Sequence, residues 1–347
     1  MYQHGGDIYH HVNCLDFSAN INFLGIPEKM KQALHDSIEE CVNYPDVHMT
    51  ALKQALARKE GVKEANIICG AGAADLIFRS VQAIKPKKAL LLAPGFQEYE
   101  QALNTVDCDL EFYYLTEANG FKTLPDLLER LDESLDMVFI CNPHNPTGLI
   151  TDKTLIRAIM DRCEEKNIFL MLDECFLDLT EHPEAETQLP ELDRYPHLVI
   201  LKALTKMYAI PGIRMGYAFT SNEALIATMT ERAQAWPVSH PAQKAGESAA
   251  DLGDFEAKSR EAAARERHFL KNELAKRGIV TYDSRANYIF LHTKPDFAEA
   301  MLARQILVRD CSNYRGLEKG YFRIAVKNHD DNKTLLAAID EWLGGGQ

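Results

Sequence analysis

Short hydrophobic runs alternate with longer amphipathic runs along the first two thirds of the chain. The hydrophobic runs are nearly continuous in apolar residues, which is typical of strands buried on both faces of a parallel sheet. Five of them are predicted as strands, over residues 88–93, 136–141, 168–172, 198–201 and 215–220. The intervening runs, such as 73–84 and 153–166, have helical periodicity. This βαβ alternation predicts a layered α/β domain.

The last third of the chain has a different pattern. A long, charged, amphipathic helix is predicted over residues 254–277, and Gly278 is a signal for its end. Short elements follow: strands at 287–293, 306–309 and 321–327, and helices at 296–304 and 331–343. We therefore predict a smaller α+β domain at the C-terminus. The expected division is an N-terminal arm over 1–30 that packs with the small domain, a large domain over 31–236 and a small domain over 237–347.

Composition and charge narrow the class of protein. The 347 residues include 38 Lys and Arg against 51 Asp and Glu, which gives a formal net charge of −13. This charge argues against a partner that is nucleic acid or an anionic membrane. No stretch has the roughly 18 apolar residues of a membrane span, and the N-terminus lacks the features of a signal peptide. The eight cysteines form no CxxC pair, and the twelve histidines form no HExxH, so we expect a cytoplasmic protein without a metal site.

A lysine and an arginine lie close together after one predicted strand, in the segment ALTKMYAIPGIRMG over residues 203–216. A lysine at the end of a buried strand loses hydration, which lowers its pKa and lets the neutral amine of Lys206 form a Schiff base. Eight residues later, the guanidinium of Arg214 can hold a phosphate in a bidentate pair. A strand end with a solvated lysine would give the same pattern.

Polar residues also follow two other predicted strands. Asn145 lies in the turn CNPHNPTG, and Asp173 follows the strand 168–172. The carboxyl ends of parallel strands are where α/β proteins bind ligands. Asn145 could therefore direct its amide at a ligand, and Asp173 could pair with a cation such as a protonated ring nitrogen. Alternatively, Asn145 caps a turn and Asp173 forms a cap or an ion pair.

Two further features indicate anion binding. Small residues precede the predicted helix 73–84 and would let backbone N–H groups approach an anion, although a tight turn is the alternative. These residues are Gly70, Ala71, Gly72 and Ala73. In the small domain, Arg309 and Arg323 lie in or at the end of strands. A buried arginine usually has an anionic partner, which is either a ligand or a structural acid.

The order of these features resembles the fold-type I pyridoxal-phosphate enzymes, the aspartate aminotransferase superfamily, over essentially the whole chain. The YPD, NPTG, DE and GxRxG patterns are shared with histidinol-phosphate aminotransferases. Other segments look like the L-threonine-O-3-phosphate decarboxylases, which make the aminopropanol phosphate arm of cobalamin. These are HGG at 4–6, LDFSANIN at 15–22, PGF at 94–96, RANY at 285–288 and ILVRDCSNYRGL at 306–317.

The resemblance implies a three-layer large domain with a mainly parallel sheet, a homodimer and the cofactor pyridoxal 5'-phosphate. It assigns catalytic roles to Lys206, which would carry the cofactor as a Schiff base, and to Asp173, which would keep the ring nitrogen protonated. The other implied cofactor contacts are Gly70, Ala71, Gly72, Ala73, Phe96, Asn145, Thr205, Arg214 and, in the partner subunit's site, Tyr44. The implied substrate contacts are His4, Gly5, Asn20, Asn145, Arg309 and Arg323.

The expected reaction is decarboxylation of O-phospho-L-threonine to (R)-1-aminopropan-2-yl phosphate and CO2. The alternatives are a histidinol-phosphate-type aminotransferase and a phosphoserine decarboxylase that gives ethanolamine phosphate. The chain departs from the family pattern at Ala203, Phe23 and His144. Phe176 stands where many aminotransferases have a tyrosine, and it cannot donate to the ring hydroxyl, which favours decarboxylation. The sequence leaves open which of Arg309 and Arg323 meets the substrate's carboxylate and which its phosphate.

Overall fold

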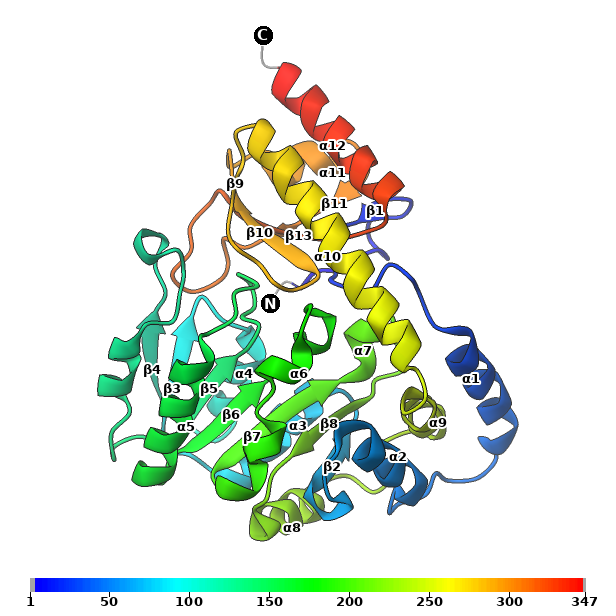
Figure 1. Ribbon diagram of the computed structural model, residues 1–347, viewed down its shortest axis with the longest axis vertical. Coiled ribbons are helices and arrows are strands. Elements are labelled where there is room, and N and C mark those ends of the chain that lie inside the picture. The colour runs from blue at the N-terminus through cyan, green and yellow to red at the C-terminus, as the bar shows by residue number, and fades with distance from the viewer. Residues whose placement is uncertain (1–3, 346–347) are drawn as a thin grey trace.

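The computed structural model describes residues 4–345, and its larger part is built on a seven-stranded sheet (Figure 1). The strands are β2 (Ile67–Gly70), β3 (Lys88–Ala93), β4 (Asp109–Tyr114), β5 (Met137–Cys141), β6 (Phe169–Asp173), β7 (Leu198–Ala203) and β8 (Gly216–Phe219). Their order is β2-β8-β7-β6-β5-β3-β4. The pairs from β7 to β4 are parallel, whereas β8 runs antiparallel to both of its neighbours.

Helices cover both faces of this sheet, which gives the large domain three layers. The helices of this part are α1 (Glu28–Glu40), α2 (Thr50–Glu60), α3 (Ala73–Ile84), α4 (Gln97–Asn104), α5 (Lys153–Lys166), α6 (Pro183–Glu186), α7 (Leu204–Met207), α8 (Glu223–Glu231) and α9 (His240–Ala249). In β5, Val138 and Ile140 pack into one hydrophobic core, and Met137 and Phe139 into another on the opposite face. Because successive side chains of a strand point to opposite faces, a strand buried on both faces must be apolar throughout, as β5 is.

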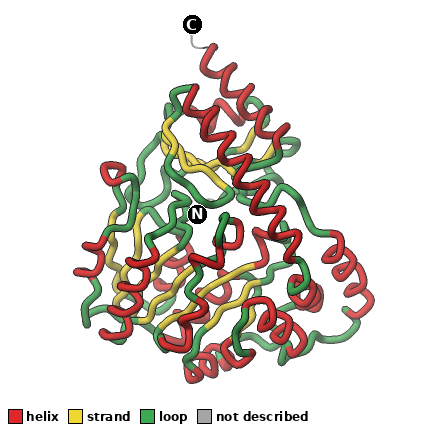
Figure 2. Tube along the Cα trace, viewed as in Figure 1, coloured by secondary structure: helices red, strands yellow, loops and turns green. Residues whose placement is uncertain are grey.

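The smaller part has a four-stranded antiparallel sheet in the order β12-β13-β10-β9. Its elements are α10 (Gly253–Lys276), β9 (Val280–Thr281), β10 (Tyr288–His292), α11 (Phe297–Leu302), β11 (Ile306–Leu307), β12 (Arg309–Asp310), β13 (Tyr321–Ala325) and α12 (His329–Gly344). In the arm, β1 (Leu15–Asp16) pairs in parallel with β11, and Phe17 is buried in the core of this part. Figures 1 and 2 show α10 running from the small sheet down to the large part.

The predicted fold class is confirmed: a large, mainly parallel α/β unit is joined to a smaller α+β unit. The run 215–220 does contain a strand, but β8 is antiparallel and not part of the parallel set. The run 306–309 contains two short strands, because β11 pairs with the arm and β12 pairs with β13. The domain limits stay predictions; α9, which begins just after position 236, contacts α1 and α2.

Residues 4–345 lack two kinds of feature. No helix among them is both long enough and apolar enough to cross a membrane. Nor do three or more His, Cys, Asp or Glu side chains among them come together in a group that could hold a metal ion.

Candidate active site

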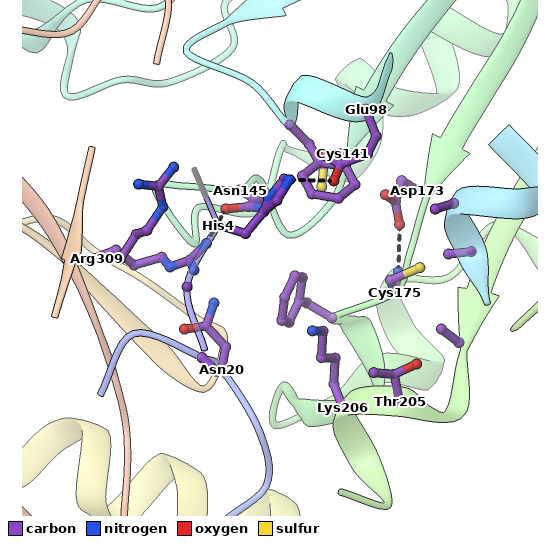
Figure 3. Close-up of a pocket in the computed structure, with 18 of the residues that line it drawn as sticks. His4, Asn20, Glu98, Cys141, Asn145, Asp173, Cys175, Thr205, Lys206 and Arg309 are labelled. Atoms are coloured by element: carbon purple, nitrogen blue, oxygen red, sulfur yellow. Dashed lines mark hydrogen bonds and ion pairs between the residues drawn. The ribbon is translucent and has the colours of Figure 1, made fainter. Parts of the chain in front are cut away.

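A cavity of about 270 Å³ lies at the carboxyl ends of the central strands and is lined by residues of the large unit, the small unit and the arm. Most of the predicted site residues line it: His4, Gly5, Asn20, Ala73, Phe96, Asn145, Asp173, Thr205, Lys206, Arg214, Arg309 and Arg323. Figure 3 shows several of these side chains pointing toward one another from different elements. Residues 70–72 lie just before this lining, in the turn that enters α3.

Lys206 lies on α7, which directly follows β7, so the strand end delivers its amine to the cavity. Burial lowers the pKa of this amine to about 8, and the nearby guanidinium groups of Arg323 and Arg214 contribute in the same direction. Its Nζ lies 5.6 Å from the centre of the Phe176 ring. A substantial fraction of Lys206 is therefore a neutral amine near pH 8, which is the nucleophilic form.

Asp173 ends β6 and is buried, with only 5% of its surface exposed. Its Oδ2 accepts a hydrogen bond of 2.5 Å from the hydroxyl of Tyr99, and its Oδ1 accepts one of 2.9 Å from the backbone N–H of Cys175. Burial and the adjacent carboxylate raise the pKa of Tyr99, so that hydroxyl remains a donor. The two donors fix the orientation of the carboxylate, which lines the cavity and can meet a cationic ring nitrogen there.

The N-terminus of α3 and the guanidinium of Arg214 lie together at one side of the cavity. Gly72, the residue before the helix, has φ of +85°, and a Cβ there would lie 2.5 Å from Nη2 of Arg214. Nη2 donates a long hydrogen bond of 3.5 Å to the carbonyl of Ala71. Position 72 therefore requires a glycine for two reasons: the positive φ is unfavourable for other residues, and the guanidinium of Arg214 leaves no room for a Cβ. The free N–H groups of the helix and the guanidinium form a site suited to a phosphate.

Arg323 and Asn145 meet across the two units. Nη1 of Arg323 donates to Oδ1 of Asn145 at 2.6 Å, and Nη2 donates to the carbonyl of Ser18 at 3.1 Å. Among the described residues, Nε of Arg323 and Oδ1 of Asn20 are buried and have no hydrogen-bond partner. Buried polar groups are costly when they are unpaired, so the cavity is suited to a polar ligand that would meet them.

Arg309 is held by its own loop. Its Nη1 donates to the carbonyl of Asp310 at 2.6 Å, and its Nη2 donates to Oδ1 of Asn313 at 2.9 Å. Burial and the guanidinium groups of Arg309 and Arg323 lower the pKa of His4. The two arginines give this part of the cavity its positive charge, and we call it, together with His4, the anion end.

The sequence analysis missed two residues of the first turn of α4. Tyr99 bonds to Asp173, and Glu98 lines the cavity beside His4. Their position in the sequence could have indicated a role in the site, because α4 begins just after the carboxyl end of β3. Loops at the carboxyl ends of parallel strands commonly bind ligands.

Tyr44 lies outside the cavity lining. Its side chain is 76% exposed, and its ring stacks on that of Trp236 with 4.2 Å between centroids.

The donor set fits pyridoxal phosphate. Lys206 provides an amine for the aldehyde, and Asp173 provides a buried carboxylate for the ring nitrogen. The absence of a Cβ at Gly72 lets the guanidinium of Arg214 lie beside the N-terminus of α3. Together they provide a place for the phosphate. The anion end is separate from these groups and remains for a substrate.

Comparisons with known proteins agree with this geometry. The threonine-phosphate decarboxylase of Salmonella typhimurium is 39% identical over 339 residues, which cover 95% of this chain and 92% of that protein. The adenosylcobalamin biosynthesis bifunctional protein CobDQ of Leptospira interrogans is 29% identical over 95% of this chain and 39% of its own. The crystal structure of the histidinol-phosphate aminotransferase from Clostridium acetobutylicum superposes with a TM-score of 0.90 at 28% identity, covering 95% of this chain and 99% of that one. Residues 12–339 match the model of the aminotransferase class I and II family, and the chain therefore belongs to that family.

Proposed function

We propose that this chain is a pyridoxal-phosphate-dependent decarboxylase that converts O-phospho-L-threonine to (R)-1-aminopropan-2-yl phosphate and CO2 in cobalamin biosynthesis. The observation that carries the proposal is one cavity that combines Lys206 and Asp173 with the separate anion end. The near full-length similarity to a threonine-phosphate decarboxylase and the name of the Leptospira relative support this substrate and this pathway.

The cofactor side of the cavity has a residue for each part of pyridoxal phosphate. Lys206 would bind the aldehyde, Asp173 would meet the ring nitrogen, and Arg214 and the N-terminus of α3 would hold the phosphate. Thr205 and Phe96 belong to the same lining. When bound, the cofactor supplies a cationic ring that accepts the electron pair left by the broken Cα bond. The protein contributes the orientation of the substrate and the protonation of its own groups.

The anion end provides that orientation. The substrate carries a phosphate and a carboxylate. The cavity is lined by Arg309 and Arg323 of the small unit and by His4 of the arm, whose imidazole can take up a proton. By holding both anionic groups, these side chains would fix the orientation of the bonds at Cα and so select which of them breaks. Lys206, with a pKa of about 8, is suited to return a proton to Cα after CO2 has left.

The experiment is a product analysis with O-phospho-L-threonine, O-phospho-L-serine and histidinol phosphate side by side. We expect CO2 and an amine from phosphothreonine without any keto acid, and none from a Lys206→Ala variant. Phosphoserine lacks one methyl group, which changes affinity by only about 1–3 kcal/mol. Glutamate formed from 2-oxoglutarate with histidinol phosphate would show instead that the chain is an aminotransferase, an alternative favoured by its superposition on that enzyme.

We also infer a cytoplasmic homodimer. All eight cysteines are free, as expected in a reducing compartment. Tyr44 and Val42 are exposed large apolar side chains, 76% and 86% accessible, on the segment that links α1 to α2. Such exposed apolar groups are typical of an interface. In the dimer we assign to Tyr44 a contact with the cofactor phosphate of the partner subunit.

A further inference from the structure

Glu98 is a carboxylate inside a cavity whose expected ligands are anions. It lies on the first turn of α4, and its side chain is only 15% exposed. Oε1 of Glu98 lies 3.4 Å from Nε2 of His4, and Figure 3 shows this contact as a dashed line across the cavity. Oε2 is buried and has no hydrogen-bond partner among the described residues. An ionised carboxylate in this place would repel a bound phosphate, so its protonation state matters for substrate binding.

Charged groups from several elements face this pair. Lys206 of α7, Arg309 of β12 and Asp173 of β6 act on Glu98, and Arg309 and Arg323 of β13 act on His4. Burial outweighs the cations and raises the pKa of Glu98 to about 7. Burial and the two guanidinium groups lower the pKa of His4. When the pair holds one proton in the absence of a ligand, these opposite shifts therefore favour the proton on Glu98 and a neutral imidazole on His4.

We propose that Glu98 is a positioning residue for the substrate phosphate, and that it transfers its proton to His4 when a phosphate dianion binds at the anion end. The proton leaves Oε1 of Glu98 and binds Nε2 of His4. Nδ1 of His4, which already carries its hydrogen, donates to a phosphate oxygen. The products are a carboxylate and an imidazolium, so no proton is exchanged with the solvent. The inference rests on the proposed function, because it requires a phosphorylated substrate.

The charges explain why binding would move the proton. A phosphate dianion beside His4 stabilises the imidazolium and opposes the effect of Arg309 and Arg323. The resulting hydrogen bond is charge-assisted, which makes it shorter and stronger than one from a neutral imidazole. The new carboxylate of Glu98 is paired with the imidazolium and no longer acts on the phosphate as a lone charge. A substrate without a phosphate cannot form this charge-assisted hydrogen bond, so the Glu98–His4 pair also favours phosphorylated substrates over others.

The test compares the wild-type holoenzyme with Glu98→Gln and with Glu100→Gln as a control. Glu100 lies on the same helix, and its carboxylate pairs with Arg315 at 2.8 Å. Calorimetry with (R)-1-aminopropan-2-yl phosphate, in buffers of different ionisation enthalpy, counts the protons taken up on binding. Because the pKa of Glu98 is about 7, about half of the wild-type carboxyl groups carry the proton at pH 7 before binding. A glutamine cannot supply that proton, so at pH 7 we expect Glu98→Gln to take up about half a proton more than the wild type. Glu100→Gln should match the wild type.

Turnover gives a second readout. At pH 7 we expect Glu98→Gln to raise KM for O-phospho-L-threonine by about tenfold, because the proton on His4 must then come from the solvent, while kcat changes by less than about threefold. The ratio of its KM to the wild-type KM should fall toward one as the pH is lowered, because protonation of His4 by the solvent then becomes easier. The phosphate ester titrates equally with both proteins and cancels in the ratio. A His4→Gln variant should show a similar rise in KM, and its KM ratio to the wild type should not fall when the pH is lowered, because glutamine cannot take up a proton.

Three results would overturn the inference: equal proton uptake by the wild type and Glu98→Gln, a KM ratio that does not change with pH, or acid rescue of His4→Gln. If Glu98→Gln does not fold, His4→Gln is used in its place to test the inference. If the wild type releases no CO2, the proposed function is wrong, but the calorimetric comparison still tests the pair through a phosphate ester.

Discussion

At the scale of single residues, the chemistry of the cavity depends on buried groups whose neighbours set their protonation. Asp173 ends β6, Lys206 lies on α7 just after the neighbouring parallel strand β7, and both side chains reach the same cavity. The surroundings of the two side chains differ, and each suits the role that we propose for the residue. The lysine is deprived of solvent and faces two guanidinium groups, whereas the aspartate accepts two hydrogen bonds. This environment favours the neutral amine of Lys206 and holds the carboxylate of Asp173 in one orientation.

The lowered pKa of Lys206 predicts how the apoprotein captures its cofactor. Only the neutral amine attacks an aldehyde, so the rate of capture should rise with pH and reach half its maximum near pH 8, well below the ordinary lysine value of 10.5. Stopped-flow absorbance after mixing apoprotein with pyridoxal phosphate measures this rate. Borohydride followed by mass spectrometry should find the added mass on the wild type and not on Lys206→Ala. A half-maximum near pH 10.5 would contradict the prediction.

The hydroxyl of Tyr99 can be removed without changing the volume of the core. Tyr99→Phe leaves Oδ2 of the buried Asp173 without its donor, so the free energy of unfolding should fall by about 2 kcal/mol. Tyr113→Phe is a matched control, because that hydroxyl also donates at 2.5 Å, but to the exposed Asp126. We expect this control to lose less than about 1 kcal/mol. Urea unfolding compares the two, and equal losses would count against an important role for the Tyr99 bond.

Residues at strand ends could be predicted from the sequence, but Glu98 and Tyr99 could not. A strand end combines an abrupt change from apolar to polar residues with a known place at the ligand-binding edge of the sheet. Glu98 and Tyr99 lie in QEYEQALN, where the pattern is that of an ordinary helix start with acidic residues near the N-terminus. Which side of that turn faces the cavity depends on the angle at which α4 packs, and this angle is a tertiary property.

At the scale of elements, the turn between β2 and α3 is tightly constrained. A methyl group at Gly72 would lie 2.5 Å from Nη2 of Arg214, and φ there is +85°. Gly72→Ala should therefore both strain the backbone and displace the guanidinium, and we expect affinity for pyridoxal phosphate to fall by at least about tenfold, as for the loss of one charge-assisted contact. Fluorescence titration of the apoprotein measures this affinity.

Gly61 gives a control that separates the two effects. It ends α2 with φ of +69°, but a Cβ there would meet no atom within 4 Å. Gly61→Ala should cost about 1 kcal/mol of stability through its backbone and leave cofactor affinity unchanged. If both variants lost affinity equally, the close approach of Arg214 to Gly72 would not be the cause.

The same scale shows which elements a pattern of apolar residues can predict. Helices α3 and α5 begin and end where periodicity placed them, and β3 matches its hydrophobic run. Strand β4, with the sequence DLEFYY, was missed because it lies at the edge of the sheet and mixes charged and aromatic residues. The antiparallel direction of β8 was also missed, since a short apolar run shows burial but not strand direction.

At the scale of the whole molecule, the question is what covers the exposed apolar segment between α1 and α2. Val42 is 86% exposed, and Tyr44 is 76% exposed beside Trp236, while the chain carries a net charge of −13. Like charges oppose association, so a stable dimer needs apolar contacts of this kind. We expect sedimentation to give a mass near twice 39.1 kDa at micromolar concentration.

Two substitutions distinguish an interface from a cofactor contact at this segment. Val42→Asp places a charge in the proposed interface and should raise the dimer dissociation constant by at least about tenfold, since a buried unpaired charge is costly. Tyr44→Phe keeps the ring and removes only the hydroxyl that we assign to the cofactor of the partner subunit. It should remain a dimer and bind pyridoxal phosphate about tenfold more weakly, the usual effect of losing one hydrogen bond to a charged group. If Tyr44→Phe binds the cofactor like the wild type while Val42→Asp is monomeric, the segment is an interface without the assigned contact. If both variants remain dimers, the subunits associate through another surface, because an interface centred on Val42 could not hold an aspartate.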